Sequence, residues 1–265
     1  MLQVIEFHHT SNVSAWLAQI GASDWAAGTY LRRILAEGKF HDRYGSRSRV
    51  LLLTEGDRLL SFCTYAEQDE IIAPSLTPWA GFLYTFPPER GRRRAGKLLE
   101  HAHHLARDEG HSFLYLESDE VGLYEKYGFS FWRTMTDREG HETSVFRLPV
   151  TRMDYSGVLG KTVRGAVDRP LGSAHPRHPE LVYPVNYGYV DGVTGGDGAP
   201  QDAYILGADR PLARFEGTVI GVLHRLNDCE DKWVVSVNGA SFSREAILDA
   251  IAFQEQYFMG ELYTL

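Results

Sequence analysis

The segment from Trp79 to Leu99 constrains the fold most, because it joins a strand pattern to a helix pattern through a short basic turn. Trp79 to Phe86 is rich in aromatic and β-favouring residues, and Pro87-Pro88 ends that run. Apolar residues then recur at helical spacing as far as Gly110, which supplies a stop: Leu98, Leu99, Ala102, Leu105 and Ala106. A strand that runs through a basic turn into a helix is typical of a phosphate-binding site.

The first turn of the expected helix falls at about Gly91 to Gly96. Its N–H groups have no partner within the helix, and the helix dipole adds partial positive charge at this end. Basic side chains surround the same turn: Arg90, Arg92, Arg93, Arg94 and Lys97. We therefore expect this turn to bind a diphosphate.

These residues resemble the signature of the GNAT superfamily of N-acetyltransferases, which is Gln or Arg, two residues, Gly, one residue, then Gly or Ala. The corresponding run is Arg90-Gly91-Arg92-Arg93-Arg94-Ala95, in which Arg93 stands where the family usually has Gly. Leu123 to Phe129 (LYEKYGF) resembles the second motif of the family. The resemblance covers residues 1–150. It implies an acetyl-CoA site formed by Arg90, Gly91, Arg92, Arg93, Arg94, Ala95, Gly96 and Lys97.

The same resemblance implies that Tyr124 is the general acid that protonates the leaving thiolate; the alternative is that its ring only packs against the sheet. For the general base the sequence offers Glu117, Asp119 and Glu120, which spacing alone does not separate, and we take Glu117 as the candidate. His101, His103 and His104 are expected on a solvated helix face. The amine acceptor, a small molecule, cannot be identified from the sequence.

Charge is unevenly distributed along the 265 residues. The formal net charge is −8; residues 1–153 hold 18 basic and 20 acidic side chains, and residues 154–265 hold 9 and 15. The acidic second half argues against nucleic acid as a partner and suits a divalent-cation site. With 43% hydrophobic residues, the chain can form two cores.

The two cysteines, Cys63 and Cys229, fall one in each half, so we expect reduced thiols and no disulfide. The N-terminal residues MLQVIEFHHT lack a basic flank and a long apolar core. No run approaches the roughly 18 apolar residues of a membrane span. We therefore expect a soluble cytoplasmic protein with no membrane partner.

Strand and helix patterns alternate in the first half. They predict a strand at 2–8, helices within 11–40, a hairpin at 49–66, strands at 79–86, 112–117, 129–135 and 143–148, and a short helix at 119–127. The expected fold is α+β, a mixed sheet with flanking helices. The polar run at 149–156 has no period, and we expect a linker at 151–156 between domains 1–150 and 157–265. Short β-like runs predict a small β-barrel in the second domain, and Ser243 caps a C-terminal helix.

Tyr183 to Tyr189 (YPVNYGY) and the acidic loop Asp197 to Asp202 (DGAPQD) resemble the centre of the family I inorganic pyrophosphatases. The resemblance spans roughly residues 155–265. It implies that Asp197, Asp202 and Asp231 bind Mg²⁺, and that Arg169, Tyr187 and Lys232 contact pyrophosphate or phosphate. Hard oxygen ligands on a Gly-rich turn suit Mg²⁺.

Two departures from that family stand out. Ala199 occupies the place of an Asp that helps to activate water, and Phe258 the place of a phosphate-binding Lys. The connection at 172–180 is longer than usual and carries His175, Arg177 and His178, which either line the phosphate pocket or lie on a surface loop.

Two hypotheses follow. The first is an acyl-CoA-dependent N-acetyltransferase fused to a Mg²⁺-binding, pyrophosphatase-like domain whose hydrolysis is weakened. The second is a non-catalytic protein of two modules that senses acyl-CoA and phosphate, with Arg93 and Ala199 marking decayed sites. The oligomeric state stays open, and a homodimer is compatible with either hypothesis.

Overall fold

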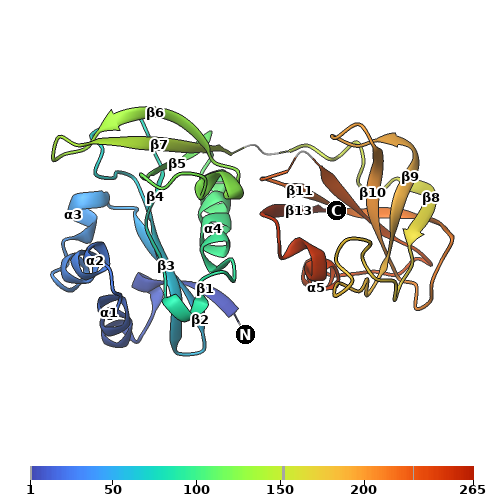
Figure 1. Ribbon diagram of the computed structural model, residues 1–265, viewed down its shortest axis with the longest axis horizontal. Coiled ribbons are helices and arrows are strands. Elements are labelled where there is room, and N and C mark those ends of the chain that lie inside the picture. The colour runs from blue at the N-terminus through green and yellow to red at the C-terminus, as the bar shows by residue number, and fades with distance from the viewer. Residues whose placement is uncertain (1, 151–152, 229) are drawn as a thin grey trace. The chain divides into compact units, whose positions relative to one another are not determined.

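The computed structural model describes residues 2–150, 153–228 and 230–265 (Figure 1). The chain divides into two compact units, Met1–Arg152 and Met153–Leu265. The linker expected at 151–156 begins on residues 151–152, which lie outside the described residues, as does Cys229. Cys63 is buried and has a free thiol.

The first unit is built on a seven-stranded mixed sheet with the strand order β1-β2-β3-β4-β5-β7-β6. Neighbouring strands are antiparallel, except for the parallel pair β4 and β5. Its strands are β1 (Leu2–Glu6), β2 (Arg49–Glu55), β3 (Arg58–Ala66), β4 (Trp79–Thr85), β5 (Phe113–Glu117), β6 (Ser130–Thr136) and β7 (Glu142–Pro149). Its helices are η1 (Phe7–His9), α1 (Val13–Gly21), α2 (Ala26–Ala36), α3 (Phe40–Tyr44), η2 (Pro87–Glu89), α4 (Arg94–Asp108) and η3 (Tyr124–Tyr127).

Helices cover both faces of this sheet (Figure 1). α1, α2 and α3 lie on one face, where Trp16, Leu31 and Tyr44 pack against Phe62 of β3. α4 lies on the other face, and its buried side chains include Leu98 and Leu99. The two faces are therefore chemically separate, and a side chain's position along a strand decides which set of helices it meets.

Two local expectations differ from this structure. The short helix expected at 119–127 is confined to η3, because the chain turns at Gly122, whose φ is +74°. His103 was expected on a solvated face, yet it is fully buried, and its Nε2 lies 3.2 Å from the carbonyl oxygen of Pro149.

The second unit is a five-stranded β-barrel with a helix outside it. The strand order β12-β10-β9-β8-β11 closes through pairing of β12 with β11, and β13 extends the sheet from β11. Its elements are β8 (Thr162–Arg169), β9 (Asn186–Thr194), β10 (Pro200–Leu206), β11 (Arg214–Arg225), β12 (Asp231–Ser236), α5 (Arg244–Glu255) and β13 (Gly260–Thr264). The expected fold class, a mixed α+β sheet followed by a small β-barrel with a C-terminal helix, is confirmed.

Ser243 caps α5 as expected, since its Oγ accepts a hydrogen bond from the N–H of Ala246 at 3.2 Å. One apolar cluster draws on all the barrel strands and fills the interior: Val163, Val190, Ile205, Val219 and Val235. A second cluster packs α5 against the outside of the barrel through Ile247, Ile251, Tyr204 and Val234. Val234 and Val235 thus mark the outer and inner faces of β12.

The barrel depends on close backbone contact between β8 and β9. A β-carbon placed on Gly165 would lie 2.0 Å from the carbonyl oxygen of Tyr189. A β-carbon on Gly188 would lie 2.0 Å from the carbonyl oxygen of Ala166. Both distances are far below van der Waals contact, so only glycine allows these strands to approach each other.

Candidate functional site

The sheet of the first unit opens between β4 and β5. Among the described residues, the two strands pair in register only at Trp79 and Tyr115. Beyond that pair, β4 carries a bulge where Phe82 adopts a left-handed φ of +48° and the register with β3 shifts. A bulge bends its strand and leaves backbone groups without ladder partners. No residue preference in the sequence signals it, since Phe is a poor choice for positive φ.

The basic turn leads from η2 into α4 much as the sequence predicts, although the helix proper begins at Arg94. The N–H groups of its first turn, from Arg94 onward, lack partners within the helix. The turn reaches the helix through Gly91 at φ +76° and Arg93 at φ +54°. The left-handed backbone at Arg93 accounts for the usual preference for Gly at this position.

The ring of Tyr127 packs against this turn. The Cζ atom of Arg93 lies 5.7 Å from the centre of the Tyr127 ring, within the range of a cation–π contact. A β-carbon placed on Gly96 would lie 2.9 Å from the same ring. Gly96 therefore lets η3 pack against the start of α4.

The basic side chains of the turn have different environments. Arg94 pairs with buried Glu89 at 2.9 Å, and Arg58 pairs with the same carboxylate at 2.8 Å. Arg90 donates to the carbonyl oxygen of Thr85 at 3.0 Å and so braces the end of β4. The side chains of Arg92 and Lys97 are exposed. An anion at the turn would thus meet backbone N–H groups together with Arg92 and Lys97.

Tyr124 lies in η3 with 8% of its surface exposed. Its ring centre is 6.0 Å from that of Phe146, which pairs with Leu116 in the neighbouring strand. Burial raises the pKa of Tyr124. The phenol is therefore protonated at neutral pH and can act as a proton donor.

Glu117 ends β5 and lies on the same face of the sheet as Tyr115. Its Oε2 atom is buried and has no hydrogen-bond partner within the described part of the chain. Burial, followed by the negative charge of Asp69, raises the pKa of Glu117 to about 8. A carboxyl group with this pKa becomes an effective proton acceptor as the pH rises above neutrality.

Asp69 is a residue that sequence reasoning missed. It is 6% exposed, and burial raises its pKa to about 7. Its Oδ2 would lie 2.8 Å from a β-carbon on Gly81, so the missing side chain of Gly81 makes room for it beside β4. A loop carboxylate of this kind has no local signal, because its burial depends on a distant strand.

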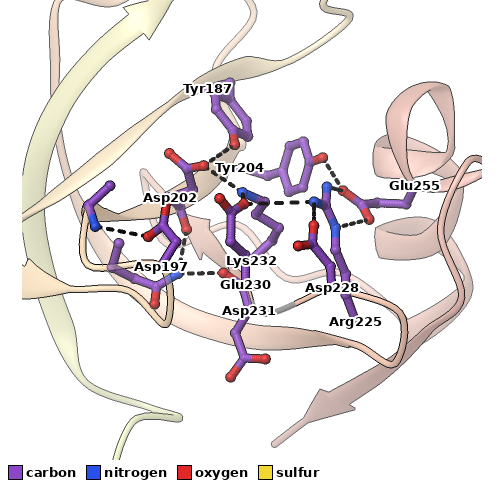
Figure 2. Close-up of polar contacts among 12 residues, drawn as sticks. Tyr187, Asp197, Asp202, Tyr204, Arg225, Asp228, Glu230, Asp231, Lys232 and Glu255 are labelled. Carbon is purple, nitrogen blue, oxygen red and sulfur yellow. Dashed lines mark hydrogen bonds and ion pairs between the residues drawn. The ribbon is translucent and has the colours of Figure 1, made fainter. Parts of the chain in front are cut away.

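In the second unit, the buried ammonium of Lys232 gathers the acidic side chains (Figure 2). Its Nζ lies 2.5 Å from Oδ2 of Asp202 and makes a still closer contact with Glu230. The hydroxyl of Tyr187 donates to the same Asp202 oxygen at 2.6 Å. Asp197 lies on the exposed turn before β10, where its Oδ1 accepts the N–H of Ala199 at 2.9 Å. That backbone hydrogen bond holds the pKa of Asp197 below its usual value.

Asp231 does not join this group (Figure 2). Its carboxylate accepts the hydroxyl of Tyr155 at 2.6 Å and lies 2.7 Å from Nδ1 of His224. Strand alternation explains the difference, because Lys232 and Val234 face α5, whereas Asp231 and Val235 face the barrel interior. Glu230, two residues before Lys232, takes the place on the α5 side.

The donor set therefore does not fit a magnesium site made of Asp197, Asp202 and Asp231. Within the described residues, no group of three or more His, Cys, Asp or Glu side chains has an arrangement that could hold a metal ion. Ala199 adds no ligand, and the inner oxygen of Asp202 already accepts two donors.

A buried ion-pair network adjoins Lys232 and was not expected from the sequence (Figure 2). Arg225 is 3% exposed and holds Glu255 of α5 through two hydrogen bonds of 2.7 and 2.9 Å. It also donates to Asp228 at 2.9 Å, and its Cζ lies 3.5 Å from the centre of the Phe258 ring. Phe258, which stands where the pyrophosphatase family has a phosphate-binding lysine, thus packs against the guanidinium of Arg225.

The basic side chains expected at a phosphate site gather around two tyrosines. Cζ of Arg169 lies 5.1 Å from the Tyr187 ring centre and 5.8 Å from that of Tyr183. The His175 ring stacks on Tyr183 and lies 5.2 Å from His178. Arg177 is exposed on the same loop. Burial and then the charge of Arg169 lower the pKa of His175.

Comparison with known proteins concerns the first unit. A family model described as an acetyltransferase (GNAT) domain matches residues 29–132. The first unit therefore contains a GNAT acetyltransferase domain. No curated protein matches the chain at a significant level. None of the described helices is both long and apolar enough to cross a membrane.

Solved structures with similarity to the chain include three acetyltransferases. The ribosomal-protein-S18-alanine N-acetyltransferase of Escherichia coli is 15% identical over 59% of this chain and 98% of its own, with a TM-score of 0.40. The aminoglycoside 6'-N-acetyltransferase of Enterococcus faecium is 11% identical over 57% and 99%, with a TM-score of 0.42. An N-acetyltransferase of Staphylococcus aureus Mu50 is 18% identical over 57% and 98%, with a TM-score of 0.41.

Proposed function

We propose that the first unit transfers an acetyl group from acetyl-CoA to a small-molecule amine. One observation carries the proposal: Glu117 and Tyr124 lie on opposite faces of the sheet at the point where β4 and β5 part. Tyr115 and Glu117 share the face of Trp79, which by the register with β3 is the face covered by α1–α3. Tyr124 packs with Phe146 on the face of α4 and the basic turn.

This arrangement separates the two proton transfers of the reaction. The amine nitrogen forms a bond to the thioester carbonyl carbon, and its proton passes to Glu117. The carbon–sulfur bond then breaks, and Tyr124 donates its hydroxyl proton to the leaving thiolate. The opening at the β4 bulge lets a thioester held at the basic turn reach an amine on the other face. The bound diphosphate rests on the first-turn N–H groups of α4 with Arg92 and Lys97.

The test is release of free thiol from acetyl-CoA in the presence of a panel of primary amines. Tyr124→Phe should lower kcat by about 10² to 10⁴-fold, the usual share of general acid catalysis, with little change in acetyl-CoA affinity. Tyr65→Phe is the matched control, because the Tyr65 hydroxyl donates to Glu109, at the far end of α4. Equal activity of the two variants would reduce Tyr124 to a packing residue.

For the second unit we propose binding of phosphate or pyrophosphate by the basic side chains around Tyr183 and Tyr187. The supporting observation is the convergence of Arg169 and His175 on these rings, with His178 and Arg177 on the adjoining loop. Lys232, expected to contact phosphate, is left out because its buried ammonium is held by Asp202 and Glu230. We do not extend the proposal to hydrolysis through Mg²⁺, because the ligand set does not assemble. Calorimetric titration of the full chain with pyrophosphate tests it: Arg169→Met should abolish the heat of binding, whereas Arg164→Met, on an exposed strand position, should not.

A further inference from the structure

The carboxylates of the acidic loop region already have a cation. Lys232 is 2% exposed, yet its ammonium contacts Asp202 and Glu230, whose side chains are 33% and 28% exposed. The charged nitrogen is thus buried behind two carboxylates that reach solvent. Lys232 therefore acts as a buried counter-ion, unlike a solvent-exposed lysine that forms a weak surface ion pair.

A divalent ion would have to displace this ammonium. Mg²⁺ requires six oxygen ligands at short distances and in nearly octahedral geometry. Oδ2 of Asp202 accepts both Lys232 and Tyr187, and Asp231 faces the barrel interior, where Tyr155 and His224 engage it. If Mg²⁺ took Asp202 and Glu230, the ammonium of Lys232 would remain buried without a carboxylate, which is strongly unfavourable.

Among the described residues, the other carboxylates near Lys232 already have a cation. Asp228 and Glu255 are held by Arg225, which is itself buried. The α5 side of β12 beyond Lys232 is apolar, beginning with Val234. Ala199 adds a methyl group where a further carboxylate would have helped to balance a divalent charge.

We propose that Lys232 is the resident cation of the cluster formed by Asp202, Glu230 and Asp197, so that the second unit holds its acidic loop without a divalent metal. Removal of the lysine charge should then let Asp202 and Glu230 hold Mg²⁺, with water completing its coordination. Asp202 would still accept the hydroxyl of Tyr187 at 2.6 Å and Glu230 would still pair with Arg225 at 3.8 Å, but neither would face the lysine ammonium, and Asp197 lies on the exposed turn before β10. Lys232 and a divalent ion are alternative cations for these carboxylates, and this protein uses the lysine.

The experiment is calorimetric titration of the full chain with magnesium chloride, paired with thermal unfolding in the same salt. Wild type should give no saturable heat at millimolar Mg²⁺ and no rise in Tm. Lys232→Met should bind Mg²⁺ at least about tenfold more tightly than wild type, with a rise in Tm on addition of the ion. Adding Asp202→Asn to that variant should abolish the gain.

Lys161→Met, which removes an exposed lysine from the same unit, is the control for the change in net charge and should behave as wild type. Lys232→Gln repeats the measurement if the methionine variant does not fold. Saturable Mg²⁺ binding by wild type that Lys232→Met does not strengthen would overturn the proposal. Folded Lys232→Met and Lys232→Gln that bind no Mg²⁺ would overturn it as well.

Discussion

The carboxylate of Glu117 and the ring of Tyr124 lie on opposite faces of one sheet, although Glu117 ends β5 and Tyr124 follows soon after it in the sequence. Strand alternation directs Glu117 toward α1–α3, and the turn at Gly122 brings the chain back to the α4 face at Tyr124. The base and the acid that we propose therefore cannot exchange a proton directly. A reacting molecule that passes between β4 and β5 would meet both.

The pH dependence of acetyl transfer should report Glu117. Because burial raises its pKa to about 8, the group is largely protonated at neutral pH and becomes a competent base only as the pH rises. We expect kcat/KM to increase through about pH 8 and then level off. Glu117→Gln should lower the plateau by about 10² to 10⁴-fold and remove this limb.

The measurement should use an acceptor amine whose own pKa lies well below neutrality, so that the substrate does not titrate in the same pH range as Glu117. Glu120→Gln, an exposed neighbour, is the matched control and should preserve the limb. A profile that is identical in wild type and Glu117→Gln would assign the base to another group, with Asp69 the first to examine.

The same group makes stability depend on pH in a defined direction. The folded-state pKa of Glu117 is raised from 4.5 to about 8, so the folded chain holds a proton that the unfolded chain has released. Its contribution to stability is fully present below pH 4.5 and is lost as the pH rises through about 8. Asp69 acts with the same sign, from 3.8 to about 7.

We therefore expect the Tm of wild type to fall across this window more steeply than that of Glu117→Gln. Thermal unfolding between pH 4.5 and 8.5, followed by tryptophan fluorescence, measures the difference. Parallel curves for the two proteins would mean that Glu117 gains a partner in solution.

Acetyl-CoA affinity should depend on the exposed cations of the basic turn. Arg92→Glu with Lys97→Glu should weaken binding by at least about tenfold, equivalent to about 1.4 kcal/mol, and make the remainder less sensitive to salt. Binding should survive in part, because the N–H groups of α4 are unchanged. Lys161→Glu with Arg164→Glu changes the net charge equally in the second unit, and calorimetry should find its affinity unaltered.

Arg225 should be among the costliest positions in the second unit. Arg225→Met leaves Glu255 and Asp228 without their buried partner, and we expect a loss of about 3 to 5 kcal/mol in the free energy of unfolding. Arg164→Met breaks an exposed pair with Glu216 and should cost no more than about 1 kcal/mol. Urea denaturation distinguishes these values readily; similar losses for both variants would contradict the assigned burial.

Local signals predicted the elements well. Pro87, the apolar spacing of α4 and Ser243 each act within a few residues, and the turn, the helix and the cap lie where those residues indicate. β13 was not expected, because Gly260–Thr264 is short and gains its order from pairing with β11.

Side-chain partners were harder to predict, since register decides them. Asp231 and Glu230 are neighbours in sequence, and only the pairing of Asp231 with His224 and the contact of Glu230 with Lys232 show that they face opposite ways. Arg225 finds Glu255 on α5, and Asp69 is buried beside Gly81 of β4, so no pattern within the sequence marks either residue. Arg93 is the opposite case, because the family's usual glycine at that position could have indicated the left-handed backbone that Arg93 adopts.

Gly165 and Gly188 carry a consequence for how this protein could change over time. Because any side chain at either position would overlap a carbonyl oxygen of the facing strand, the two sites should stay glycine in every library of functional variants. They would do so even in variants that have lost all binding in the second unit, provided that the barrel is still selected for folding. Invariance at these two positions would reflect the close strand packing of the barrel. A mutational search for binding residues should therefore exclude both positions.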